Sequence, residues 1–361
     1  MFLNYKLIFT QNIYIYLLAF LIIPAILFYK CIIFNGNNYN TQFLSKPVTD
    51  CIKGLSIIII LLHHVSLRMQ PPKLMLPYTF FGHLAVSMFF FLSGYGLTMS
   101  KLHKKDYLNK FFSRRLSKVY LPFILINALT LILLFSVFNT KFSISQTILY
   151  LSGLNLIDST QWFVISILLF YVVFYLCFKF FKQEVAPKII LVYAFSYFLI
   201  LIFFRFGEWW YNTAFCFPIG VYIALYYNKF VDFMKKNYTT ICLSSLISFA
   251  FFFYLGHFIP TLFSVFFNTI SSVCFVFLML SLLFKIKFNS KPLIFVGSIA
   301  YEMYLIHMKI FVQYFGCIKI KGSYTVYIYL AIVILVSFLF NKLFKLMRKP
   351  ILTSNNRTQT M

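Results

Sequence analysis

Lys53 and His64 are the residues of this chain whose spacing most directly suggests chemistry. Eleven positions separate them, and the sequence between Gly54 and Leu62 is almost wholly apolar. Eleven residues is close to three α-helical turns, so on a helix both basic groups lie on one face, about 16 Å apart along the axis. A histidine buried in a membrane helix is a candidate functional residue by default. For a lone histidine, structural packing between helices is an equally good interpretation.

The composition places this helix in a membrane. Of 361 residues, 61% are hydrophobic and 11% are charged, and the mean hydropathy is +0.87. A soluble domain does not contain that much apolar surface. The predicted fold class is therefore all-α, a polytopic bundle of transmembrane helices.

The charge balance is strongly basic, with 32 lysines and arginines against seven acids and a formal net charge of +25. This charge suits an anionic membrane surface and an anionic cofactor. The cations are spread over short loops between apolar segments, so no nucleic acid partner is expected. The seven cysteines stand singly, without the paired spacing of a metal site, and no metal is expected.

About eleven hydrophobic runs have spanning length. They fall near 7–33, 51–69, 81–100, 119–138, 162–181, 188–206, 212–228, 239–258, 262–284, 294–315 and 323–345. The run at 144–157 is short and contains Gly153 and Asn155, so it is interpreted as an interfacial or re-entrant segment. The first run lacks the basic start and cleavage site of a signal peptide and is expected to remain as an anchor.

The basic residues indicate the orientation. With the N-terminus outside, most lysines and arginines fall on one side, the clearest group lying at 101–118, and the C-terminal tail lies on that side too. The positive-inside rule assigns this side to the cytoplasm. The expected localisation is the cell membrane, with a cytoplasmic C-terminus. Thr49 or Asp50 is expected to cap the helix that holds Lys53 at its cytoplasmic end and His64 towards its outer end.

The segment 82–97, GHLAVSMFFFLSGYGL, combines small residues with hydroxyl groups. Gly94 and Gly96 allow helix backbones to approach closely, and the hydroxyls of Ser93 and Tyr95 offer hydrogen bonds within a bundle. Helix packing alone explains Ser93 and Tyr95 about equally well.

The segment 111–122, FFSRRLSKVYLP, leads into the next span from its cytoplasmic end. Arg115 and Lys118 are three residues apart, so on an α-helix they share a face and could grip one phosphate group together. Taken alone, a basic loop that sets the topology is the better interpretation, and it is kept for Lys104 and Lys105.

The segment 296–307, VGSIAYEMYLIH, contains Glu302, the only acid deep within a predicted span. Such a carboxyl group is expected to be protonated or paired with a cation such as a histidine, and a buried structural pairing is the simpler interpretation. His307 lies about 140° further around the helix, so the two side chains face different partners. Earlier in the chain, Trp162 stands at the start of a predicted span. Anchoring at the membrane interface explains this tryptophan as well as a functional role does.

Together these segments resemble the acyltransferase 3 family of integral membrane acyltransferases, typified by bacterial sugar O-acetyltransferases. The resemblance covers about Asp50 to Lys345. The first core helix of the family carries a basic residue, then Gly, and a His eleven residues beyond the basic one. Lys53, Gly54 and His64 match this pattern, with Lys in place of the usual Arg. His63 does not match it and is interpreted as a packing or assisting residue.

The other segments carry the resemblance further. Residues 82–95 are similar to the Gly-x-x-x-Val-x-x-Phe-Phe-x-x-Ser-Gly-aromatic signature of the family, and 115–118 is similar to its Arg-x-x-Arg element, with Lys118 as the second cation. Residues 300–307 are similar to its Ser-Tyr-x-x-Tyr-Leu-x-His string. Ala300 replaces the Ser there, so a role for that hydroxyl is in doubt.

The resemblance implies an enzyme with a ten-helix acyltransferase core at 45–346, preceded by an extra transmembrane helix and connector at 1–44 and followed by a basic cytoplasmic tail at 347–361. It implies transfer of an acyl group, most often acetyl, from cytoplasmic acyl-CoA to a hydroxyl of a cell-surface glycan or a lipid-linked saccharide. The expected partners are acetyl-CoA as donor, that acceptor, and membrane lipid.

The same resemblance assigns the site. His64 and Glu302 are the catalytic candidates, with His64 as general base or transient acyl carrier. The residues assigned to the phosphates of CoA are Lys53, Arg114, Arg115 and Lys118. The residues assigned to substrate binding or structural support are His63, Ser93, Tyr95, Trp162, Tyr301 and His307.

Two other functions are alternatives to acyl transfer. A transporter or flippase of a polar lipid-linked sugar would bind its cargo with the same buried polar groups, although transporters often show two related halves and this chain shows no internal repeat. A glycan polymerase would call for a large outer loop, whereas the longest predicted outer connection runs only from Asn139 to Gln161.

Overall fold

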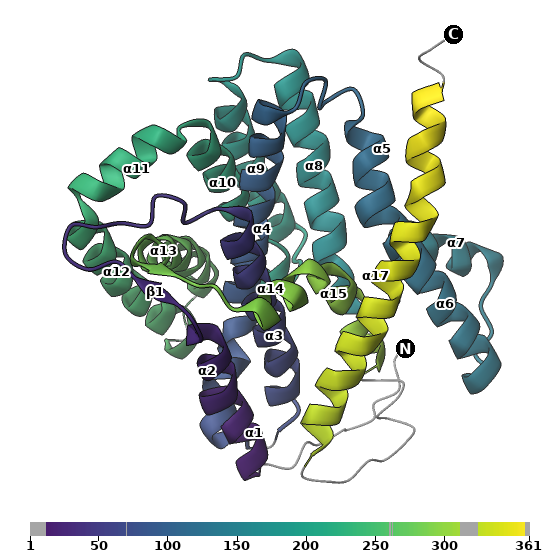
Figure 1. Cartoon of the computed structure of the whole chain (residues 1–361). Helices are drawn as coiled ribbons and strands as arrows, with labels where there is room; N and C mark the ends of the chain where they lie inside the picture. Colours follow the sequence, from purple (N-terminus) through teal and green to yellow (C-terminus); the bar gives the residue numbers. More distant parts are fainter. Residues whose placement is uncertain (1–11, 70, 260, 262, 311–323, 358–361) are drawn as a thin grey trace. The chain divides into compact units, whose positions relative to one another are not determined.

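The structure, a computed structural model, is built of helices with one short pair of strands (Figure 1). It describes residues 12–69, 71–259, 261, 263–310 and 324–357, with side chains as far as residue 347. With π- and 3₁₀-helical turns labelled η, the elements are α1 (Ile13–Leu17), η1 (Leu18–Ile22), α2 (Ile23–Phe28), β1 (Ile32–Ile33), α3 (Lys46–Ser66), η2 (Lys73–Met75), α4 (Leu76–His103), α5 (Phe111–Arg115), η3 (Leu116–Tyr120), α6 (Leu121–Phe138), α7 (Ile144–Ser152), η4 (Ser159–Gln161), α8 (Trp162–Phe180), α9 (Ala186–Phe203), η5 (Glu208–Trp210), α10 (Cys216–Leu225), α11 (Tyr227–Lys236), α12 (Tyr238–Phe258), α13 (Ser264–Lys285), β2 (Ile286–Lys287), α14 (Lys291–Ser298), α15 (Ala300–Lys309) and α17 (Thr325–Arg357).

Eight helical segments within the described residues are long and apolar enough to cross a membrane. They are Lys46–Ser66, Lys73–His103, Phe111–Phe138, Ser159–Phe180, Ala186–Phe203, Tyr238–Phe258, Ser264–Lys285 and Thr325–Met347. Each coincides with a hydrophobic run found in the sequence, because a span needs about 20 apolar residues in helical form. The all-α polytopic fold class is confirmed.

The other three predicted spans are shorter or interrupted. The run at 7–33 contains a helical segment at 13–28, which includes a π-helical turn. The run at 212–228 contains the ten-residue helix α10. The run at 294–315 is broken between α14 and α15, where Ile299 leaves helical geometry with φ −119° and ψ 11°. Residues 311–323 of that stretch lie outside the described residues. The 144–157 run contains the nine-residue α7, which ends at Gly153 in the left-handed conformation.

The chain divides into two compact units, described here separately. Of the described residues, the first unit contains 110–165, 299–310 and 324–357, and the second contains those between 12 and 109 and between 166 and 298. The division at 1–44, 45–346 and 347–361 stays a prediction. Within the last of those ranges the backbone of α17 remains helical to Arg357.

Glycine pairs allow close helix crossings in the second unit. A Cβ on Gly54 of α3 would overlap the carbonyl oxygen of Leu293 in α14, and one on Gly297 of α14 would overlap that of Asp50 in α3. Gly94 of α4 and Gly220 of α10 form a second reciprocal crossing of the same kind. Membrane helices associate through such small residues because lipid provides little hydrophobic driving force between them.

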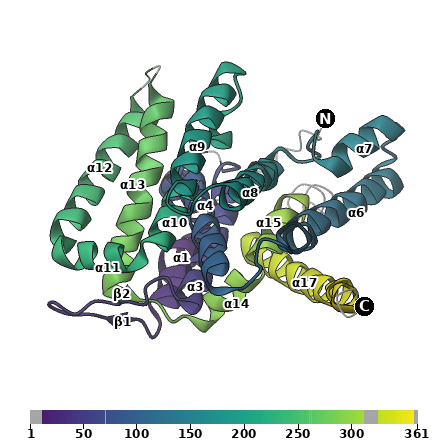
Figure 2. The ribbon, with the colours of Figure 1, turned by 90° about the horizontal axis from the view of Figure 1, so that it is seen from above.

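At the periphery of the second unit, α12 and α13 run side by side (Figure 2). The strand β1 pairs antiparallel with β2, which directly follows α13, in the register Ile32 to Lys287 and Ile33 to Ile286. The segment after β1 stays at this helix end, because Asn40 donates from its backbone to Phe284 O at 2.8 Å and from Nδ2 to Leu283 O at 3.1 Å.

In the first unit, α15 packs against α17, α6 and the turn η4. The helical segment 111–138 is continuous but contains the π-helical turn η3 between α5 and α6. Among the described side chains of this unit, Tyr329 on α17 is the largest that is fully buried.

Candidate active site

The uninterrupted helix α3 holds both Lys53 and His64. It begins at Lys46, four residues earlier than the predicted start, with Ser45 as N-cap and Pro47 in the first turn. The expectation of a cap at Thr49 or Asp50 is therefore wrong. Proline is favoured in the first helical turn because no intrahelical partner exists there for its missing N–H. The extra turn brings one more lysine into the helix.

A bridged carboxylate lies at the first end of α3. Lys46 Nζ lies 2.5 Å from Asp50 Oδ2, and Lys53 Nζ lies 3.1 Å from Asp50 Oδ1. The side chain of Asp50 is 9% exposed and that of Lys53 is 34% exposed. Two ammonium groups and one carboxylate carry a net positive charge. The ion pairs with Asp50 hold the two lysine side chains in position. Sequence reasoning missed Lys46 because the helix was expected to begin after it.

At the other end of α3, the two histidines have different surroundings. His63 Nδ1 donates to the carbonyl oxygen of Tyr78 at 3.0 Å, and the ring packs against Gly82, where a Cβ would overlap it. This bond leaves Nε2 of a neutral His63 as an acceptor. The half-buried His64 ring lies 5.0 Å from that of His63, centre to centre, at an interplanar angle of 64°.

Two further histidines lie near this pair, and sequence reasoning missed both. The ring of His83 on α4 stacks on that of His257 on α12, with centres 5.2 Å apart and planes 24° apart. His83 interacts electrostatically with both His63 and His257. Its Nε2 is buried and has no hydrogen-bond partner among the described residues. The signal was present in the sequence, since His83 stands in the segment 82–97 at a position that the signature leaves open.

An acid and an amide extend the cluster. Glu208, at the start of η5, interacts electrostatically with His257 and accepts a hydrogen bond from Asn268 Nδ2 at 3.1 Å. We call His63, His64, His83, His257 and Glu208 the histidine cluster. It contains four of the six histidines of the chain. In the described part of the chain, no group of three or more His, Cys, Asp or Glu has the arrangement needed to hold a metal ion.

Ser93 and Tyr95 lie on α4, at its crossing with α10. Tyr95 is buried, and its ring centre lies 6.3 Å from that of Phe91 and 6.3 Å from that of Tyr227. Gly94 provides the close approach, since a Cβ there would overlap the carbonyl oxygen of Phe217. The same expectation for Gly96 is wrong, because a Cβ on Gly96 would meet nothing within 4 Å.

The cations assigned to CoA phosphates are divided between the units. Lys53 is in the second unit, whereas Arg114, Arg115 and Lys118 are in the first. Arg115 ends α5 and Lys118 lies inside the π-helical turn η3. A π-helical turn has i to i+5 bonds and so is wider than an α-helical turn. The expectation that Arg115 and Lys118 share an α-helical face is therefore wrong.

The turn η3 is joined to α15 by Tyr301. The Tyr301 hydroxyl donates to the carbonyl oxygen of Val119, within η3, at 2.6 Å. Tyr304, one turn further along α15, donates to the carbonyl oxygen of Thr160. Trp162 opens α8 and is buried, with its ring centre 6.1 Å from that of Phe163. These contacts give Tyr301 and Trp162 positions inside the first unit.

Glu302 and His307 on α15 are both buried. Glu302 Oε1 accepts a hydrogen bond from Asn341 Nδ2 of α17 at 2.8 Å. His307 is fully buried, and its Nδ1 donates to the carbonyl oxygen of Tyr304 at 2.7 Å. Polar groups buried in this way are normally hydrogen-bonded, because unpaired ones are costly.

A buried ion pair near the end of α15 was not foreseen from the sequence. Lys309 Nζ lies 3.9 Å from Asp158 Oδ2, and the two side chains are 8% and 11% exposed. Asp158 also caps η4 by accepting hydrogen bonds from the backbone N–H and the hydroxyl of Thr160. The sequence does not predict this ion pair, because its two residues are 151 positions apart.

The structure therefore gathers the proposed site residues into two sets. The second unit holds Lys53, Ser93, Tyr95 and the histidine cluster, which includes His63 and His64. The first unit holds Arg114, Arg115, Lys118, Trp162, Tyr301, Glu302 and His307. The roles assigned to individual residues stay predictions.

Comparison with known proteins adds one match. No curated protein and no solved structure matches the chain. A family model described as an acyltransferase domain matches residues 49–342, which is most of the chain and contains every residue of the two sets. Eight membrane-length helices and this match identify the chain as a member of the acyltransferase 3 family of multi-pass membrane acyltransferases.

Proposed function

We propose that this acyltransferase transfers an acetyl group from cytoplasmic acetyl-CoA to a hydroxyl of a cell-surface glycan or a lipid-linked saccharide. The protein would act in the cell membrane with its C-terminus in the cytoplasm. The products are an oxygen ester on the acceptor and the free thiol of CoA. The observation that carries the proposal is helix α3, which holds a cationic group at one end and a histidine pair at the other.

The geometry of α3 suits a donor and an acceptor arriving from opposite sides of the membrane. About 11 residues of α-helix span about 16 Å, roughly half of the apolar thickness of a bilayer. A phosphate held near Lys53 would thus lie well away from His64. The extended pantetheine arm of CoA would cover that distance and carry the thioester towards the histidine.

His64 would act as a general base. It accepts the proton of the acceptor hydroxyl as the oxygen attacks the thioester carbonyl carbon, and the C–S bond then breaks. The CoA thiolate leaves and takes up a proton, so the imidazole returns to its neutral form. His63 would position its neighbour, because its own Nδ1–H is held by Tyr78 O. A neutral imidazole suits this role near pH 7.

The cations would bind the phosphates of CoA. Lys46 and Lys53 share Asp50, so an incoming phosphate would meet a net positive group that is already held in place. For Arg114, Arg115 and Lys118, which belong to the first unit, contact with CoA phosphates is proposed from the family resemblance alone. Amide and carboxylate groups commonly bind sugar hydroxyls. The histidine cluster contains the carboxylate of Glu208, and the Asn268 amide donates a hydrogen bond to it.

The reaction is tested with purified full-length protein in lipid nanodiscs. Acetyl-CoA is added with cell-surface polysaccharide or lipid-linked saccharide, and both free CoA thiol and ester in the saccharide are measured. We expect the two products to form in equal amounts. Thiol release without any ester would contradict transfer to a saccharide, and binding of the saccharide with no release of thiol would favour a transporter.

A further inference from the structure

An open groove lies between helices of the second unit, and none of its lining residues belongs to the histidine cluster or to the lysine–aspartate group of α3. Its volume is about 790 Å³, within the range of roughly 300–1,000 Å³ usual for sites that bury small molecules. Its walls come from α9, α10, α11 and α13. The lining residues are Pro187, Lys188, Leu191, Pro218, Ile219, Tyr222, Ile223, Tyr226, Lys229, Phe230, Phe233 and Phe277.

The lining combines a long apolar surface with two cations. Most of the twelve residues are aliphatic or aromatic, and Lys188 and Lys229 are the charged ones. Leu191, Tyr222 and Phe233 leave 47%, 56% and 56% of their surface uncovered by protein. A groove of this composition suits a ligand with an anionic head and a hydrocarbon tail.

The two lysines lie at the same level of the bundle. Lys188 is in the first turn of α9, which begins at Ala186, and Lys229 is in the first turn of α11, directly after α10 ends. Phe277 lies deeper, in the middle of α13. The cations therefore mark the headgroup end of the groove, and Leu191 and Phe277 lie at hydrocarbon depth.

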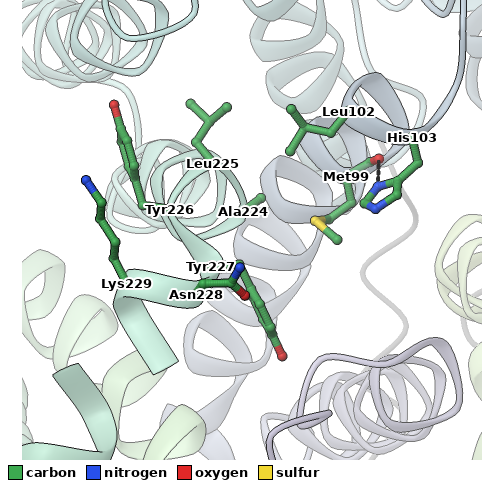
Figure 3. Close-up of a pocket in the computed structure, with 9 residues that line it drawn as sticks. All are labelled: Met99, Leu102, His103, Ala224, Leu225, Tyr226, Tyr227, Asn228 and Lys229. Atoms are coloured by element: carbon green, nitrogen blue, oxygen red, sulfur yellow. Dashed lines mark hydrogen bonds between the residues drawn. The ribbon is translucent and has the colours of Figure 1, made fainter. Parts of the chain in front are cut away.

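Helix α11 presents one face to the groove. Lys229, Phe230 and Phe233 line the groove together with the N-cap residue Tyr226, whereas Val231 and Met234 are buried against protein. Lys229 Nζ lies 5.8 Å from the centre of the Tyr226 ring, a cation–π distance. Figure 3 shows these two side chains in a second pocket that they also line, on the opposite side of it from His103.

The corner between α10 and α11 is held by Tyr227. Its hydroxyl donates to the carbonyl oxygen of Thr41 at 2.6 Å, and burial raises the pKa of this phenol to about 12, so it remains a donor at neutral pH. The single acid of α11, Asp232, is exposed and does not line the groove. Among the described residues, no ion pair within 4 Å joins this carboxylate to Lys229.

We propose that this groove is a binding site for an anionic glycerophospholipid of the surrounding membrane. The lipid phosphate lies between the ammonium groups of Lys188 and Lys229, and one acyl chain lies along Leu191, Ile219 and Phe277. Bound in this way, the lipid fills the space between α9, α10 and α13 and stabilises the attachment of the peripheral α12–α13 pair.

The test compares phosphatidylglycerol with phosphatidylcholine of the same acyl chains, because the two differ only in the headgroup. Full-length protein is purified from mixed micelles, and the retained lipid is counted by native mass spectrometry. The thermal unfolding midpoint is measured with each lipid, since a ligand that binds the folded state raises it. We expect phosphatidylglycerol to be retained at least fivefold more than phosphatidylcholine and to give the higher midpoint.

Two variants remove the headgroup site and the tail site separately. Lys188→Gln combined with Lys229→Gln should lose the fivefold preference, whereas Ile219→Trp, which fills the groove, should reduce retention of both lipids. The matched control is Lys235→Gln combined with Lys236→Gln, which removes the same charge from exposed positions of α11 that do not line the groove. The control should keep the preference.

Three results would overturn the proposal. One is equal retention of the two lipids by the unchanged protein. Another is an equal loss in the groove variant and the Lys235/Lys236 control, which would show only general attraction between cations and lipid. The third is unchanged retention in both the lysine variant and Ile219→Trp. None of these measurements depends on the identity of the acyl acceptor.

Discussion

His63 and His64 are adjacent on α3 but have different surroundings. His63 is held by Tyr78 and packs against Gly82, so its ring has a fixed position. His64 projects about 100° further around the same helix, on the side of Lys53. The sequence phase separates the two side chains, but it could not foresee His83 and His257, which come from other helices. Contacts between distant segments depend on packing and have no local pattern.

His83 offers a prediction in which stability and activity change in opposite directions. His83→Phe keeps an aromatic ring against His257 but removes the buried Nε2 that has no hydrogen-bond partner among the described residues. An unpaired buried polar group costs about 1–3 kcal/mol, so we expect the free energy of unfolding to rise by about 1 kcal/mol. The measurement is chemical or thermal unfolding of the purified protein.

The activity of the same variant tests the role of the histidine cluster. We expect the KM for the acceptor to rise several-fold while the KM for acetyl-CoA stays unchanged. His103→Phe is the control, because His103 is an exposed α4 histidine bonded to Met99 O within its own helix. A His83→Phe protein that is less stable, or in which both KM values change equally, would contradict a role of the histidine cluster in binding the acceptor.

Glu302 can be examined without disturbing its hydrogen bond. In Glu302→Gln the side-chain oxygen that accepts from Asn341 Nδ2 is retained, and the other carboxyl oxygen becomes an amide NH₂ that cannot serve as an acid or base near neutral pH. If Glu302 transfers a proton in the reaction, we expect kcat to fall by about 10²-fold or more, with the unfolding midpoint unchanged. Steady-state kinetics and thermal unfolding of the variant check this. Full activity in Glu302→Gln would mean that the residue has a structural role alone.

At the scale of the helices, departures from regular geometry occur where the predicted site residues lie. The π-helical turn η3 contains Lys118 and provides the Val119 carbonyl that accepts from Tyr301. The break at Ile299 ends α14 just before the helix that carries Glu302. Such irregularities are frequent at functional sites. Hydrophobic periodicity locates a helix but does not reveal these local changes in its winding.

The crossing of α4 and α10 gives a paired prediction. Gly94→Ala places a methyl group against the carbonyl oxygen of Phe217, so we expect it to lower the free energy of unfolding by about 1–3 kcal/mol. Gly96→Ala, two residues along the same helix, meets nothing within 4 Å and should raise stability by up to about 1 kcal/mol through helix propensity.

Thermal unfolding of the two glycine variants in one detergent checks this difference. Each variant adds the same methyl group to the same helix, so general effects of the substitution cancel. Equal shifts in the two unfolding midpoints would mean that α4 and α10 do not cross at Gly94.

For the molecule as a whole, composition and hydropathy predicted the fold class and eight of the long spans, because those features depend only on local sequence. Within the described residues the three remaining runs contain shorter or interrupted helices, because hydropathy does not reveal where a helix begins or breaks. Helix α3 shows a related limit, because its start was placed at Asp50 and Lys46 was lost from the site. The ion pair of Asp158 and Lys309 required the folded chain.

The proposed orientation can be tested on whole cells. Lys141→Cys lies in the connection after α6, and Lys104→Cys lies in the connection after α4, both at exposed positions. In a variant without its native cysteines, a membrane-impermeant maleimide should label residue 141 in intact cells and residue 104 only after lysis. The opposite pattern would reverse the orientation and place the Lys53 end of α3 outside, where no acetyl-CoA is available.

The most direct test of the central claim is acetyl transfer by His64→Ala. The variant, the unchanged protein and the control His103→Ala are purified in nanodiscs, and their unfolding midpoints are compared first. With a folded His64→Ala protein, we expect the rate of ester formation from acetyl-CoA to fall by about 10²–10⁴-fold while the control keeps full activity. Undiminished transfer by His64→Ala would contradict the assignment of this imidazole as the catalytic base.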